Sequence, residues 1–146
     1  MNLGFYKPII GSMSDFTRPF QENEQLFKQA KMFWNKLDGM VWFPLIVCII
    51  LGAAFVYIYY GPYNNKPGRH YMPVHWWKFF AITFIVSLIV SIASLFLLAP
   101  SSLQGADSLK IKIALSNAFG ALIVYFVASL VTCYSFPTNA YRFLKF

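Results

Sequence analysis

Three long stretches of this chain, 41–60, 79–99 and 113–134, contain no Asp, Glu, Lys, Arg or His. An α-helix rises 1.5 Å per residue, so a helix of about twenty residues crosses a hydrocarbon core of about 30 Å. Backbone groups cannot hydrogen-bond to lipid, and each stretch must therefore form its own bonds as a helix. The sequence predicts an all-α integral membrane protein with three transmembrane helices.

Acidic residues are scarce, and none of the five lies in a predicted span. Carboxylates inside a membrane usually mark proton or cation pathways, and their absence argues against such a pathway. The two histidines, His70 and His75, have no carboxylate or thiol nearby in the sequence, so we expect no metal site. The chain also lacks a glycine-rich phosphate loop, an HExxH motif and a plausible Ser/His/Asp set. We expect neither enzyme activity nor a cofactor.

Only two cysteines are present. Cys48 lies near the beginning of the first span and Cys133 near the far end of the third, which runs in the same direction. At the helical rise their depths differ by roughly 20 Å, which is beyond the reach of a disulfide. The sequence predicts two buried free thiols.

The net charge of +7 comes from basic residues dispersed over every polar segment, so we expect no nucleic-acid partner. Several of these residues flank the spans, where lysines commonly reach anionic lipid headgroups. They are Lys28, Lys31, Lys36, Lys78, Lys110 and Lys112. Lys and Arg are equally numerous on the two sides, so the positive-inside rule does not decide the orientation. We expect an inside N-terminus in a bacterial or organellar inner membrane, which avoids translocating the N-terminal segment.

The chain divides into an N-terminal segment, 1–39, and a three-span domain, 40–146. Within the first, residues 21–37 are predicted to form an amphipathic helix that ends at Asp38–Gly39. The apolar face of that helix carries Leu26, Phe27, Ala30, Phe33, Trp34 and Leu37. Such a face either lies in the membrane interface or docks on a protein partner, and the sequence leaves both uses open.

Aromatic residues gather at the ends of the spans, where an interfacial belt is expected. The expected lipid-interface anchors are Trp42, Tyr59, Tyr60, Trp76, Trp77 and Lys78. The first loop, 61–75, contains three prolines and two glycines, which is typical of an ordered set of turns. We expect this loop to offer a further docking surface.

Small and polar residues form stripes on the second and third spans, where they would let helices approach closely. The predicted helix-packing residues are Thr83, Ser87, Ser91, Ser94, Ser116, Asn117, Gly120 and Ala121. Asn117 is the only amide in a span, and burying it without a partner costs several kcal/mol, so it should hydrogen-bond across a helix interface. Leucine in place of Ser91 or Gly120 is expected to block the close approach.

Two such stripes exceed what a lone three-helix bundle requires. They favour a non-catalytic structural or anchoring subunit of a multiprotein membrane complex, with other membrane subunits and lipid as its partners. The first alternative is a self-assembling pore, because the small size and three spans resemble the layout, though no motif, of phage holins. The second alternative is a small channel or carrier, for which the hydroxyl stripe offers only a mildly polar lining.

Overall fold

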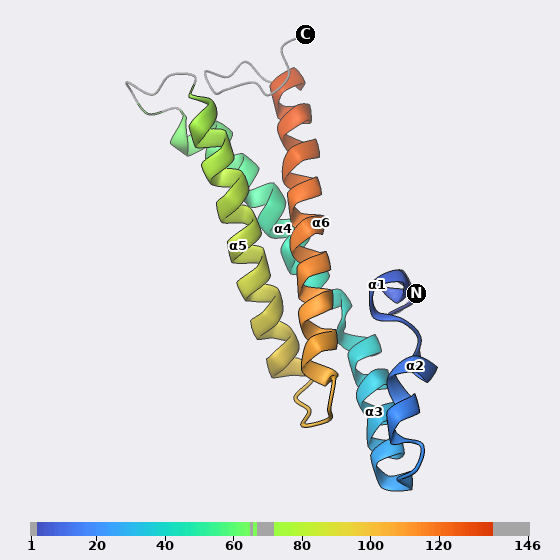
Figure 1. Ribbon diagram of the computed structural model, residues 1–146. Helices are drawn as coiled ribbons and strands as arrows, with labels where there is room; N and C mark the ends of the chain where they lie inside the picture. The colour runs from blue at the N-terminus through green and yellow to red at the C-terminus, as the bar shows by residue number, and fades with distance from the viewer. Residues whose placement is uncertain (1–2, 65, 67–71, 136–146) are drawn as a thin grey trace.

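The computed structural model describes residues 3–64, 66 and 72–135, and these residues are helical almost throughout (Figure 1). The N-terminal elements are η1 (Leu3–Phe5), α1 (Lys7–Ile10), α2 (Met13–Thr17), η2 (Arg18–Phe20) and α3 (Glu24–Met40). The long elements that follow are α4 (Trp42–Ile58), the π-helical turn η3 (Tyr59–Tyr63), α5 (Pro73–Leu98) and α6 (Ala106–Ser135). No strand occurs in the described part of the chain.

Within the described residues, three helical segments are long and apolar enough to cross a membrane: Glu24–Tyr63, Pro73–Leu98 and Ala106–Ser135. They confirm the prediction of an all-helical chain with three helices of this kind, and they suggest a membrane protein. Both α5 and α6 begin earlier than the charge-free stretches from which they were predicted. The reason is that a helix does not have to end where charged side chains begin, so α5 includes Lys78 and α6 includes Lys110 and Lys112.

Helices α4, α5 and α6 each pack against the other two. In Figure 1, α4 and α6 run in the same direction, and α5 runs in the opposite direction. At Gly52, α4 lies so close to α6 that a side chain at this position would clash with α6. A Cβ added there would lie 2.6 Å from the Ala121 carbonyl oxygen and 3.2 Å from the Val124 Cβ. Only glycine fits this crossing without a shift of one helix.

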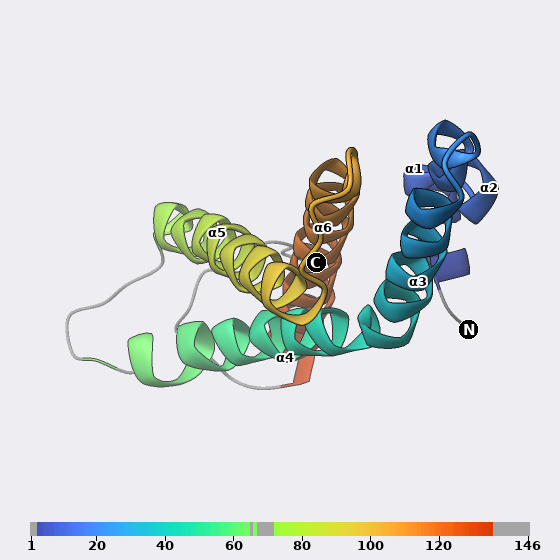
Figure 2. The ribbon, with the colours of Figure 1, turned by 90° about the horizontal axis from the view of Figure 1, so that it is seen from below.

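The break before the first span lies at Val41 and not, as predicted, at Asp38–Gly39. Helix α3 continues through Gly39, and Figure 2 shows the chain turning sharply between α3 and α4. Pro44 explains this position. It has no N–H to donate to the Met40 carbonyl four residues earlier, and its ring crowds that carbonyl.

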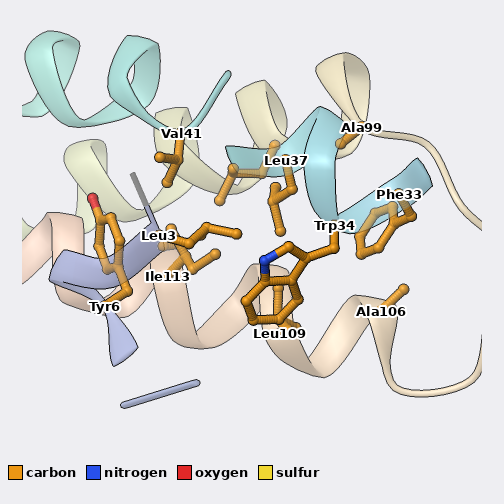
Figure 3. Packing of buried hydrophobic residues seen from close by; sticks show 12 residues of the cluster. Leu3, Tyr6, Phe33, Trp34, Leu37, Val41, Ala99, Ala106, Leu109 and Ile113 are labelled. Carbon is orange, nitrogen blue, oxygen red and sulfur yellow. The ribbon is translucent and has the colours of Figure 1, made fainter. Parts of the chain in front are cut away.

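Helix α3 begins at Glu24, where the side chain of Asn23 accepts hydrogen bonds from the backbone N–H groups of Gln25 and Leu26. Its apolar face packs into a cluster with Leu3 and Tyr6, the end of α5 and the start of α6. This N-terminal cluster consists of Leu3, Tyr6, Phe33, Trp34, Leu37, Val41, Leu95, Ala99, Ala106, Leu109, Ile113 and Ala114. Figure 3 shows Trp34 of α3 directed towards Leu109 of α6.

A second, aromatic cluster holds the opposite end of the bundle together. It consists of Val56, Tyr59, Tyr60, Trp76, Tyr125 and Cys133. The Trp76 ring stacks on Phe80 at 5.3 Å between centroids, and the Tyr60 hydroxyl lies 3.1 Å from the Cys133 sulfur. Three of the residues expected as lipid-interface anchors, Tyr59, Tyr60 and Trp76, are therefore buried. Among the other three, Trp77 and Lys78 are exposed and Trp42 is half-buried.

Candidate functional site: a buried polar junction

Polar side chains from α5, α6 and the N-terminal segment meet at Asn117, which is fully buried. Its Nδ2 donates a hydrogen bond to Ser91 Oγ at 2.9 Å. Its Oδ1 accepts a hydrogen bond of 2.5 Å from the hydroxyl of Tyr6. The amide expected to bond across one helix interface thus bonds two partners, and one of them lies 111 residues earlier in the chain.

Helix α4 joins this group through Cys48, whose thiol donates to the Ser87 carbonyl at 3.5 Å. We call Tyr6, Cys48, Ser87, Ser91 and Asn117 the polar junction. All five side chains are at most 1% exposed. Because the five residues come from the N-terminal segment, α4, α5 and α6, the junction ties together four parts of the chain.

The chemistry of the polar junction is that of hydrogen bonding. Burial raises the pKa of the Tyr6 hydroxyl above its usual value, and the nearby Cys48 thiol raises it further. The hydroxyl therefore remains protonated and keeps donating to Asn117 at physiological pH. None of the five side chains is a carboxylate or an imidazole, so the junction contains no general base that could activate its serines or its thiol.

The described residues group no three His, Cys, Asp or Glu side chains as a metal site would require. His75 lies in the first turn of α5, with its ring 5.5 Å from that of Tyr63. His70 and most of the first loop lie outside the described residues. Both cysteines are buried and free, with Cys48 beside Ser87 of α5 and Cys133 beside Tyr60.

The remaining predicted packing residues occupy different positions in the bundle. Thr83 is buried and donates to the Phe79 carbonyl, whereas Ser94 is half-buried and donates to the Val90 carbonyl. Ser116 and Gly120 are half-buried, and an added Cβ at Gly120 would meet no atom within 4 Å. Ala121 is buried at the crossing with α4.

Gly52 was not among the residues predicted for packing, although a Cβ added there would clash with the backbone of α6. The available signal was the run of small residues, Gly52–Ala54, in the middle of the first span. Sequence alone shows that such a run permits a close approach. It does not show which neighbouring helix makes that approach.

The residues expected to dock on lipid or a partner lie mostly within the N-terminal cluster. Phe33, Trp34 and Leu37 are buried against α6 and against Leu3 and Tyr6 near the N-terminus. Phe27 is half-buried beneath the Lys31 ammonium, 4.4 Å from its ring centre, and Leu26 is exposed. The apolar face of α3 therefore packs against other parts of the same chain. The sequence had indicated only lipid or a protein partner.

Lys110 was expected at a lipid headgroup and is instead fully buried near the start of α6. Its Nζ lies 3.1 Å from an Asp107 carboxylate oxygen. The same ammonium lies 4.4 Å from the centre of the Phe96 ring and 5.7 Å from that of Phe33. Cation–π attraction and the packed alkyl stem both favour this position.

Replacing Lys110 by alanine is expected to lower the free energy of unfolding by about 1–2 kcal/mol, since it removes the packed stem and the contacts with both rings. The matched control is Lys112→Ala, because Lys112 is exposed two residues further along the same helix. Thermal unfolding in detergent micelles, followed by circular dichroism, measures both effects. Equal effects of the two substitutions would contradict this account of Lys110.

No protein-family model, curated protein or solved structure matches this chain. We therefore infer its function from the geometry alone.

Proposed function

We propose that this protein is a non-catalytic structural or anchoring subunit of a multiprotein membrane complex. The observation that carries the proposal is the separation of side chains on the spans. Thr83, Ser87, Ser91, Asn117 and Ser129 are buried within the bundle, whereas large apolar residues cover the outside. The exposed apolar side chains include Ile46, Ile50, Ile85, Ile89, Leu97, Phe119, Ile123, Val127 and Val131.

The outer surface of the spans supports a role in association. Little of each span is buried within the protein. The buried share of an apolar stretch of 18 residues is 28% in the first span, 22% in the second and 39% in the third. The rest requires a cover of lipid or of other membrane helices. The small-residue stripes themselves close α4, α5 and α6 on one another, so the support for partners comes from the outer surface and not from those stripes.

A pore or a carrier is less well supported by this arrangement. A ring of subunits lining water needs a polar face directed outwards, and the polar stripe of α5 faces the bundle interior at Thr83, Ser87 and Ser91. A carrier needs polar groups that are free to bind a solute. In this protein the Asn117 amide and the Ser91 hydroxyl already bond to each other.

The first test is purification of the tagged protein, expressed at its native level, in a mild detergent, followed by mass spectrometry and native sizing. A defined set of copurifying membrane proteins, absent from an untagged control, is expected. A ring or cluster of this chain alone, together with leakage of vesicles that contain it, would replace the proposal by a pore. A monomer without copurifying proteins would also overturn it.

A further inference from the structure

Residues 3–10 lie beside the spans and not before them (Figure 1). The Tyr6 hydroxyl bonds Asn117, and the Leu3 backbone N–H donates to the Asp38 carboxylate at 2.5 Å. Cys48, which belongs to the same junction, is six residues beyond the start of α4 at Trp42. Six residues of helix span about 9 Å, so the Tyr6 side chain lies well past the start of α4.

The backbone of this short segment satisfies much of its hydrogen-bonding capacity without water. Three N–H groups of the segment, those of Tyr6, Ile9 and Ile10, and that of the following Gly11 donate to carbonyls of the segment at 2.8–3.0 Å. The Leu3 N–H is bonded to Asp38, and Pro8 has no N–H at all. Lipid cannot replace water as a hydrogen-bond partner, so each of these bonds lowers the cost of placing the segment in the membrane.

Apart from Lys7, the exposed side of the segment is apolar. Phe5 is 59% exposed and Ile9 is 49% exposed, whereas Leu3 and Tyr6 on the inward side are buried. On α4, the neighbours of Cys48 in the sequence, Ile49 and Ile50, are also exposed. The apolar surface of the first span and that of the N-terminal segment thus lie at a similar depth.

We propose that residues 3–10 form a wedge inserted into one leaflet of the membrane. Phe5 and Ile9 contact lipid acyl chains, and the exposed Lys7 extends its ammonium towards the lipid phosphates. Lipid is favoured over a protein partner because the exposed Lys7 lies between the exposed Phe5 and Ile9, and a basic residue beside apolar side chains is typical of segments that lie in a lipid interface. The wedge does not depend on the proposed subunit role, since it applies equally to an isolated protein.

The test uses the full-length protein in phosphatidylcholine vesicles that contain brominated phosphatidylcholine, which quenches fluorophores in the acyl region. The fluorophore bimane is attached to Phe5→Cys and Ile9→Cys. Ile49→Cys serves as the reference within a span, and Glu22→Cys, in the exposed turn before α3, serves as the aqueous control. The native cysteines are buried, so unsubstituted protein treated with the dye provides the blank.

Brominated lipid is expected to remove at least about half of the fluorescence at positions 5, 9 and 49, and little at position 22. Aqueous iodide should give the opposite order. Adding Tyr6→Phe to Phe5→Cys removes the hydroxyl that bonds Asn117 and should weaken lipid quenching at position 5, while the same addition leaves position 49 unchanged. Quenching of positions 5 and 9 by iodide alone would overturn the proposal. Protection of both from either quencher would assign the surface to a protein partner and overturn it as well.

Discussion

Replacing Gly52 by alanine should lower the free energy of unfolding by about 1–3 kcal/mol, the usual range for overpacking. The added Cβ would lie 2.6 Å from the Ala121 carbonyl oxygen, and a backbone atom in α6 cannot move aside as a flexible side chain does. Either α4 and α6 separate or the clash remains. The bulkier Gly52→Leu should prevent the bundle from forming.

The matched control for this prediction is Gly120→Ala. Gly120 also lies within a helix, but an added Cβ there meets no atom within 4 Å. Alanine favours a helix over glycine by up to about 1 kcal/mol, so this substitution should be neutral or stabilising. Denaturation of both variants in detergent micelles, followed by circular dichroism, gives the comparison. Destabilisation of the same size in both variants would show that the contact at Gly52 does not restrict how closely α4 packs against α6.

Replacing Asn117 by alanine should lower the free energy of unfolding by about 2–3 kcal/mol. The substitution removes the acceptor of the Tyr6 hydroxyl and the donor to Ser91, and it leaves both groups buried in an apolar surrounding. The loss should appear in the same unfolding measurement. Bromolipid quenching at position 5 should weaken too, because the N-terminal segment loses its bond to α6.

A double-mutant cycle of Tyr6→Phe with Asn117→Ala isolates the bond between these two residues. Its coupling energy should be about 0.5–2 kcal/mol, as is found for hydrogen bonds between transmembrane helices and for residues in direct contact. Tyr57→Phe is the control for loss of a tyrosine hydroxyl, since Tyr57 is exposed, and it should change stability little. Additive effects of Tyr6→Phe and Asn117→Ala would show that the bond contributes nothing to stability.

These contacts limit how the protein can meet a partner. The inward faces of α3, α5 and α6 are occupied by one another and by Tyr6. Within the described residues, the exposed surfaces include the apolar outside of the spans, Phe5 and Ile9 of the N-terminal segment, and the polar face of α3. That polar face exposes Glu24, Gln25, Lys28, Gln29, Lys31, Asn35 and Lys36. A partner subunit would therefore pack against the spans within the membrane or bind the charged side of α3 in water.

The sequence by itself determined which parts of the chain form helices long and apolar enough to cross a membrane. The charge-free stretches predicted three membrane-length helices. The opposite positions of Cys48 and Cys133 along the spans excluded a disulfide. Each of these conclusions depends on length, hydropathy or backbone chemistry, which are local properties of the chain.

Only the tertiary structure decided what covers each buried group. An apolar face such as that of α3 gains similar free energy against lipid, a partner or its own chain, so its hydropathy does not identify Leu109 and Ile113 as its neighbours. A buried amide needs a hydrogen-bond partner, but nothing local identifies Tyr6, 111 residues away, as the donor to Asn117. Likewise, Gly52 acquires its importance from the angle and position at which α6 crosses α4. Such pairings arise from the packing of the whole chain, because the physical forces that bury a residue do not specify its neighbour.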